Sequence, residues 1–179
     1  MGRQAVFVGS LLLLATSFTS PLVHAVGQGA GTVTMNGEIT DAACTIAMES
    51  RDQIIDMGVL PIGTIRQEGQ GPKQDFEIQL INCDLVKHSD PSQTWRALRM
   101  TFDGPADNGL FQVFGEARGV GLLMQDAQLR QVMPGEASAE QDIVPPTMRL
   151  AYQLRLVSDS RPLRAGSYQS LIRFKVDYY

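Results

Sequence analysis

The chain has 179 residues, enough for one domain of ordinary size with a substantial core. Its 44% hydrophobic and 19% charged residues exclude a disordered chain and a many-spanning membrane protein. Fifteen Lys and Arg against nineteen Asp and Glu give a net charge of -4, which argues against a surface built to bind nucleic acid.

Residues 1–25 have the features of a cleaved secretory signal. Arg3 precedes an apolar stretch from Ala5 to Ala15, and Val23-His24-Ala25 supplies small residues at both cleavage positions. The apolar run is too short for a comfortable membrane span, and no later segment approaches about 18 uninterrupted apolar residues. We therefore expect an exported protein rather than a membrane-anchored one.

Residues 26–35 form the next segment, an N-terminal extension ahead of a domain at 36–179. Val26 to Thr32 is rich in Gly and too poor in side-chain bulk to hold itself in a fold, which predicts a mobile tail. On composition alone, a linker without a role is the simpler explanation. Val33-Thr34-Met35, leading toward Ile39, has the alternation of a short strand.

The chain contains two cysteines, Cys44 and Cys83, which are 39 positions apart. In an oxidising compartment such a pair is most simply interpreted as one disulfide. Two buried free thiols are the alternative, and the absence of a Cys-x-x-Cys spacing disfavours a redox pair.

Period-two alternation of apolar and polar residues predicts the strands. It covers 76–80, 98–102, 148–156 and the stretch from Tyr168 to Tyr178. Turn-forming clusters at 67–72, 103–105, 107–109 and 145–146 separate these segments, and no window favours a long amphipathic helix. Short strands with Gly and Pro punctuation indicate an all-β protein, an antiparallel sandwich of the immunoglobulin type.

The C-terminal stretch is unusual because its alternation continues at full strength to Tyr179. Such a strand is either an edge strand or a sign that another polypeptide supplies the missing neighbour. Together with the tail, it suggests subunits that complete one another.

After the signal, the sequence resembles the pilin subunits of chaperone-usher fimbriae over essentially its whole length. The resemblance is carried by 36–39, 41–46, 75–83, Gly166-Ser167-Tyr168, Phe174 and the penultimate Tyr178. Within the family, residues 43–49, 53–58, 100–104, 132–134 and 174–178 are most similar to the anchor or terminator subunit at the base of P-type pili. The tail at 27–34 is instead similar to that of a main shaft pilin.

The resemblance implies an incomplete immunoglobulin-like sandwich that lacks its final strand. A periplasmic chaperone lends a strand to the open groove, and the tail of the next pilin subunit replaces it at the outer-membrane usher. The implied donor strand of this chain uses Gly27, Gly29, Gly31, Val33 and Met35. The implied groove wall and chaperone contacts are Gly166, Tyr168, Phe174, Val176, Tyr178 and Tyr179, with the terminal carboxylate held by basic chaperone residues.

A terminator would need the far pocket of that groove to be covered, so that strand exchange cannot begin. Residues 53–65 and 126–133 are the two candidates for such a cover, and the sequence does not choose between them.

The sequence offers little for catalysis. His88, the one histidine after the signal, lies in a polar stretch typical of a solvated loop, and no nucleophile motif or metal-ligand spacing accompanies it. We therefore expect no enzyme activity, no cofactor and no small-molecule substrate.

Two other classes remain as alternatives to a pilus subunit. A tip adhesin usually carries an additional lectin domain, for which roughly 150 residues leave no room. An independent immunoglobulin-like monomer would form a complete sandwich and would not need its tail.

Overall fold

The computed structural model describes residues 31–37 and 39–179, so the predicted signal, Gly27 and Gly29 lie outside the described residues. The chain separates into two units, Met1–Glu38 and Ile39–Tyr179. In the first unit, residues 31–37 have no regular secondary structure, and Val33 and Met35 are 86% and 90% exposed. The strand predicted at 33–35 is therefore absent, because a strand needs a ladder partner and these residues have none within the described chain.

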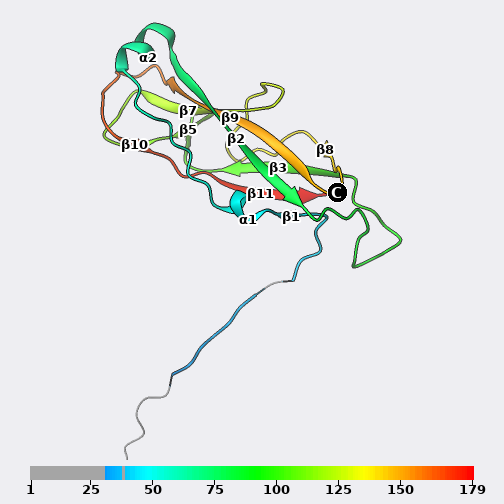
Figure 1. Ribbon diagram of the computed structural model, residues 1–179. Helices are drawn as coiled ribbons and strands as arrows, with labels where there is room; N and C mark the ends of the chain where they lie inside the picture. Colours follow the sequence, from blue (N-terminus) through cyan, green and yellow to red (C-terminus); the bar gives the residue numbers. More distant parts are fainter. Residues whose placement is uncertain (1–30, 38) are drawn as a thin grey trace, which may run out of the picture. The chain divides into compact units, whose positions relative to one another are not determined.

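The second unit consists mainly of β-strands joined by loops (Figure 1). Its long strands are β2 (Gln70–Ile81), β3 (Ala97–Asp103), β7 (Val120–Asp126), β9 (Met148–Ser158) and β11 (Arg173–Tyr178). The short ones are β1 (Thr45–Ile46), β4 (Ala106–Asp107), β5 (Leu110–Gln112), β6 (Phe114–Gly115), β8 (Gln141–Asp142) and β10 (Tyr168–Gln169). Two short helices, α1 (Met48–Arg51) and α2 (Ile62–Glu68), lie between β1 and β2.

The strands form an antiparallel sandwich. One sheet has the order β1-β2-β9-β7-β5-β4, a second has the order β11-β3-β8, and β10 pairs with β6. The central ladder of the first sheet runs from Gln70↔Val157 to Leu80↔Met148. The predicted all-β, immunoglobulin-like fold class is confirmed.

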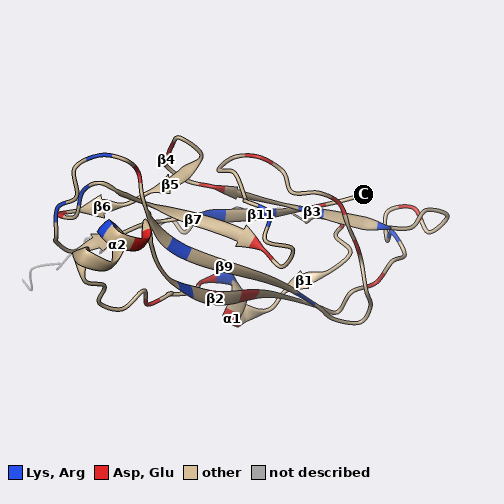
Figure 2. Cartoon of the chain, turned by 90° about the horizontal axis from the view of Figure 1, so that it is seen from above, with Lys and Arg blue, Asp and Glu red and all other residues tan. Residues whose placement is uncertain are grey.

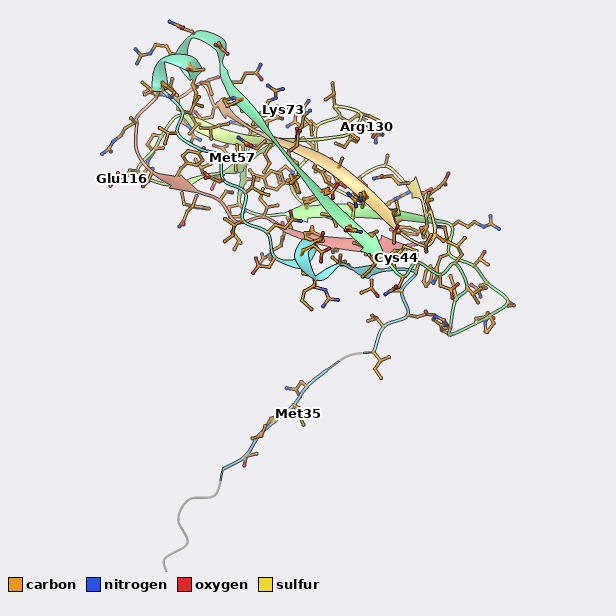
Figure 3. All side chains as sticks on the ribbon, in the orientation of Figure 1. Met35, Cys44, Met57, Lys73, Glu116 and Arg130 are labelled. Atoms are coloured by element: carbon orange, nitrogen blue, oxygen red, sulfur yellow. A yellow bond between two sulfur atoms is a disulfide. The ribbon has the colours of Figure 1, made fainter. Side chains whose placement is uncertain are left out.

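Alternation along the strands places one face of each sheet in the core (Figure 3). Ile78 and Leu80 of β2 belong to the same buried core cluster as Leu98, Met100 and Phe102 of β3, and all five are at most 2% exposed. Phe102 links the sheets, because its ring lies 4.8 Å from that of Tyr152 on β9 and 6.0 Å from that of Phe174 on β11.

Cys44 and Cys83 form the predicted disulfide. Both cysteines are buried in the core cluster, at 7% exposed each. The bridge joins the start of β1 to the end of β2, whose mutual ladder is only Thr45↔Ile81 and Ile46↔Leu80. The covalent bond therefore fixes a strand that few backbone hydrogen bonds hold.

Two predicted segments differ from the structure. The alternation from Tyr168 to Tyr178 is divided into β10 and β11, which pair with different strands; between them, the Ser170 hydroxyl donates to the Gln112 carbonyl at 2.7 Å. The turn predicted at 67–72 is instead the end of α2 followed by the start of β2. Gly69 ends the helix in the left-handed conformation, and its N–H donates to the Ile65 carbonyl.

Charges on the outer face of the first sheet are mixed (Figure 2). Lys73 pairs with Asp75 at 2.9 Å and Arg149 pairs with Glu77 at 3.0 Å, and all four side chains are solvent-exposed. Such exposed pairs add little to stability. Within the residues that the structure describes, no helix is long and apolar enough to cross a bilayer.

Candidate functional site

Each sheet of the sandwich ends in edge strands, and two of these, β1 and β11, lie next to the same cleft. In the described chain, β1 pairs with β2 alone and β11 pairs with β3 alone, each at the end of its sheet. An edge strand presents unpaired N–H and C=O groups, which are a template for pairing with another chain.

The open edge of β11 follows from its hydrogen bonds. The Tyr179 N–H donates to the Ala97 carbonyl at 2.9 Å, on the β3 side. Because alternate residues of an antiparallel strand direct their peptide groups to the same edge, Phe174, Val176 and Tyr178 direct theirs to the opposite edge. The side chains of these same three residues pack on the core. The free edge of β11 therefore lies beside a surface of apolar core side chains that includes Phe174, Val176 and Tyr178, which we call the apolar floor.

A cleft of about 920 Å³ separates β1 from the end of β11. Its lining combines residues before and within β1 with residues from a loop and from β11. The lining residues used below are Asp41, Cys44, Ile46, Arg51, Val176 and Tyr178.

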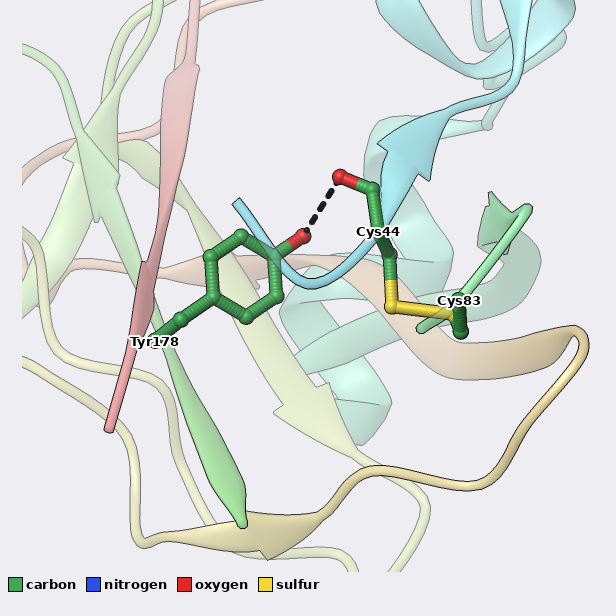
Figure 4. Close-up of a disulfide and its surroundings, with 3 residues drawn as sticks. All are labelled: Cys44, Cys83 and Tyr178. Carbon is green, nitrogen blue, oxygen red and sulfur yellow. Dashed lines mark hydrogen bonds between the residues drawn. A yellow bond between two sulfur atoms is a disulfide. The ribbon is translucent and has the colours of Figure 1, made fainter. Parts of the chain in front are cut away.

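One hydrogen bond crosses this cleft (Figure 4). The Tyr178 hydroxyl donates to the Cys44 carbonyl at 3.2 Å, from β11 to the chain just before β1. Burial raises the pKa of the Tyr178 phenol, so the hydroxyl keeps its proton well above neutral pH. Tyr178 therefore acts as a hydrogen-bond donor at this position.

The polar rim of the cleft is fixed by Asp41. Its carboxylate accepts from the Ser89 hydroxyl at 2.5 Å and from the Ser89 N–H at 2.9 Å. These hydrogen bonds lower the pKa of Asp41, which stays ionised at neutral pH. The arrangement anchors the loop around Ser89 against the segment that leads into β1.

The segment between α1 and α2 passes beside β10, at the other end of the β10–β11 stretch (Figure 1). Ile55, Met57 and Leu60 of this segment are half-buried and pack on the core, as does Tyr168 of β10. Figure 3 marks Met57 on the segment. Burial raises the pKa of Tyr168, and the nearby Asp56 carboxylate raises it further.

Of the two candidate covers, 53–65 is the one beside β10. Residues 126–133 are instead tied to β7 and to the β4–β5 turn: the Val132 N–H donates to the Met124 carbonyl and the Gln131 amide donates to the Gly109 carbonyl.

The residues assigned to the groove wall do not lie together. Val176 and Tyr178 line the cleft and Phe174 packs on the core beside them. Tyr168 lies at the far end, on β10. Gly166 lies beyond it, where an added Cβ would come within 2.5 Å of Glu116 Cβ.

Tyr179 is directed away from the cleft. Its main-chain oxygen accepts from the backbone N–H groups of Arg96 at 2.6 Å and of Ala97 at 3.2 Å, and its ring lies under the Arg99 guanidinium. Of the residues assigned to the donor strand, Gly31, Val33 and Met35 are described and are exposed.

The opposite wall of the cleft is formed by 41–46 and Arg51. The sequence did not predict these residues as part of the groove. In the sequence, Thr45 and Ile46 stand out only as part of the family motif, and Cys44 only as part of that motif and of the predicted disulfide. No sequence signal marks Arg51, because its place at the cleft depends on α1 turning the chain back toward β1.

The fold and the two open edges define a class: an immunoglobulin-like sandwich with a vacant strand position in its sheets. No protein-family model matches the chain. The chain is 33% identical to the PRS fimbrial minor pilin protein of Escherichia coli over 150 residues, covering 83% of this chain and 77% of that protein. It is 31% identical to the Fimbria A protein of Serratia marcescens, covering 93% and 97% of the two chains.

Solved structures agree with these relatives. A chain from the structure of a chaperone-usher pilus, determined to explain rod uncoiling, has a TM-score of 0.70 and 26% identity, and the match covers 86% of this chain and 98% of that one. The chain belongs to the pilin family of chaperone-usher fimbriae. It is a structural subunit of a pilus at the cell surface, and it passes through the periplasm to get there. Like these fimbrial relatives, it is not an enzyme.

Proposed function

We propose that the cleft between β1 and β11 accepts an extended segment from another polypeptide. The observation that carries this proposal is the pair of open strand edges, on β1 and β11, that flank one cleft. A periplasmic chaperone fills the position first. At the outer-membrane usher, an inserted strand would then pair its backbone with these edges and place alternate side chains on the apolar floor.

The tail of this chain is the donor for a neighbouring pilin, with Gly27, Gly29, Gly31, Val33 and Met35 facing the neighbour's groove. The described part of the tail supports this role, because Val33 and Met35 are exposed apolar residues on a segment without internal pairing. Glycine suits positions where the donor backbone approaches a groove closely.

Replacing Gly29 with Leu is expected to block insertion of the tail while leaving the subunit's own fold unchanged, since residue 29 is outside the compact unit Ile39–Tyr179. We expect loss of at least nine-tenths of the subunit from purified pili, measured by immunoblot. Gln28→Leu, on the opposite parity, is the matched control and should be incorporated normally. Equal incorporation of both variants would show that the proposed register is wrong.

Within the pilus, the finer role that we propose is that of the terminating subunit, anchored at the fibre base at the outer membrane. Two observations support it. The relative with 33% identity is a minor pilin. The segment 53–65, which includes the start of α2, lies beside β10, at the opposite end of the β10–β11 stretch from the cleft, and a cover there would stop exchange from that end. The rod structure with 26% identity supports the alternative, an ordinary polymerising pilin of the shaft.

Strand exchange distinguishes the two roles. The subunit bound to its cognate chaperone is mixed with a synthetic peptide of the tail from a shaft pilin of the same system, and chaperone release is followed by native mass spectrometry. For a terminator we expect release at least 100-fold slower than from a shaft pilin–chaperone complex measured in parallel. Release at the shaft-pilin rate would assign this chain to the shaft.

A further inference from the structure

The peptide groups of β1 alternate between its two edges. On the β2 side, the Ala47 N–H donates to a β2 carbonyl at 2.9 Å, and the Ala43 carbonyl accepts from Asp84 at 2.8 Å. By the alternation of an antiparallel strand, Cys44 and Ile46 direct their peptide groups to the opposite edge, toward the cleft.

Both of these cleft-facing carbonyls are already occupied by side chains. The Tyr178 hydroxyl donates to the Cys44 carbonyl at 3.2 Å, and Arg51 Nε donates to the Ile46 carbonyl at 3.1 Å. Both side chains line the cleft. They come from opposite sides of it, since Tyr178 is on β11 and Arg51 ends α1.

The two edges of the cleft therefore differ. The peptide groups that β11 directs to the cleft have no backbone partner in the described chain, whereas the two carbonyls of β1 are covered. A strand that enters can pair with β11 at once, but at β1 it must compete with Tyr178 and Arg51 for the two carbonyls, because both side chains occupy the space beside them.

We propose that Tyr178 and Arg51 are removable caps on the open edge of β1, which slow the entry of a strand from another pilus protein. This inference rests on the strand-accepting function proposed above. It assigns the two side chains a task separate from packing: they protect an incomplete edge from indiscriminate pairing until a strand that also fits the apolar floor displaces them.

The size of the effect follows from the strength of a hydrogen bond. A typical intramolecular hydrogen bond contributes about fivefold to an equilibrium constant. If the cap must be broken before pairing, its removal should raise the association rate by about the same factor, and removal of both caps should raise it more than either alone.

The test uses the disulfide-intact chain without its signal, refolded free of chaperone, so that the cleft is vacant and no exchange is required. The probe is a fluorescein-labelled peptide of residues 26–40 of this chain, in large excess, and fluorescence anisotropy measures its association rate. Tyr178→Phe removes only the hydroxyl, and Arg51→Met removes the guanidinium while keeping the apolar stem. Circular dichroism checks the fold, and either variant alone suffices for the test.

Two matched controls separate capping from general loosening. Thr94→Val removes an exposed hydroxyl outside the cleft lining, and Arg66→Met removes an exposed cation on α2. The proposal expects about fivefold faster association for each cap variant and unchanged rates for the controls. If the cap variants associate with the peptide no faster than the wild type, the capping proposal is wrong but the strand-accepting function stands. If neither the wild type nor any variant binds the peptide, the strand-accepting function is wrong as well.

Discussion

Replacement of Cys44 with Ser is expected to lower the free energy of unfolding by about 4 kcal/mol. The bridge to Cys83 closes a loop of 39 residues, and a crosslink of that span removes a large part of the conformational entropy of the unfolded chain. The loss is a large share of a typical domain stability of about 5–15 kcal/mol. Urea unfolding of the refolded chain, followed by circular dichroism, measures it.

The double variant Cys44→Ser/Cys83→Ser is the control for effects of the unpaired thiol. It should match the single variant to within about 1 kcal/mol, and reduction of the wild-type chain should reproduce both. Unchanged stability in the single variant would mean that the bridge contributes nothing to the fold.

Replacement of Phe102 with Ala is expected to cost about 3–5 kcal/mol, because the site is fully enclosed and a cavity would remain. Phe102 lies between Tyr152 and Phe174, so the cavity would open directly beneath the strand that forms one edge of the cleft. We therefore expect a lower urea midpoint and also weaker binding of the tail peptide to the cleft.

Leu171→Ala is the matched control for Phe102, since Leu171 is on the loop between β10 and β11 and is 70% exposed. It should change stability by no more than about 0.5 kcal/mol. A similar midpoint for both variants would contradict the position of Phe102 as the link between the two sheets.

Alternation predicted β2, β3, β9 and β11 but missed β7, where Val120, Gly121 and Leu122 are buried in succession. The segment 148–156 falls within β9, and 98–102 falls within β3. The same signal failed at 170–172: the burial alternation continues from Tyr168 to Val176, but the hydrogen-bond partners change from β6 to β3. A sequence pattern reports which side chains face the core and does not report which strand supplies the ladder.

The helix α2 was missed for a related reason. Ile65 is the one buried residue of a seven-residue helix, which is too little to produce a helical period. The wall of the cleft at Cys44 and Ile46 was missed because its peptide groups, not its side chains, define it. Backbone exposure at an edge depends on which strands are present elsewhere in the fold.

The position of the disulfide also determines how the subunit would carry a load. A pull on the tail enters the compact unit at Ile39 and reaches Cys44 five residues later. There the bridge passes it to the end of β2, which is laddered to β9 as far as Gln70↔Val157. Tension carried by the bridge would bypass the two-residue pairing of β1 and reach the longest ladder of the sheet. The bridge thus makes the subunit a mechanical link as well as a stable fold.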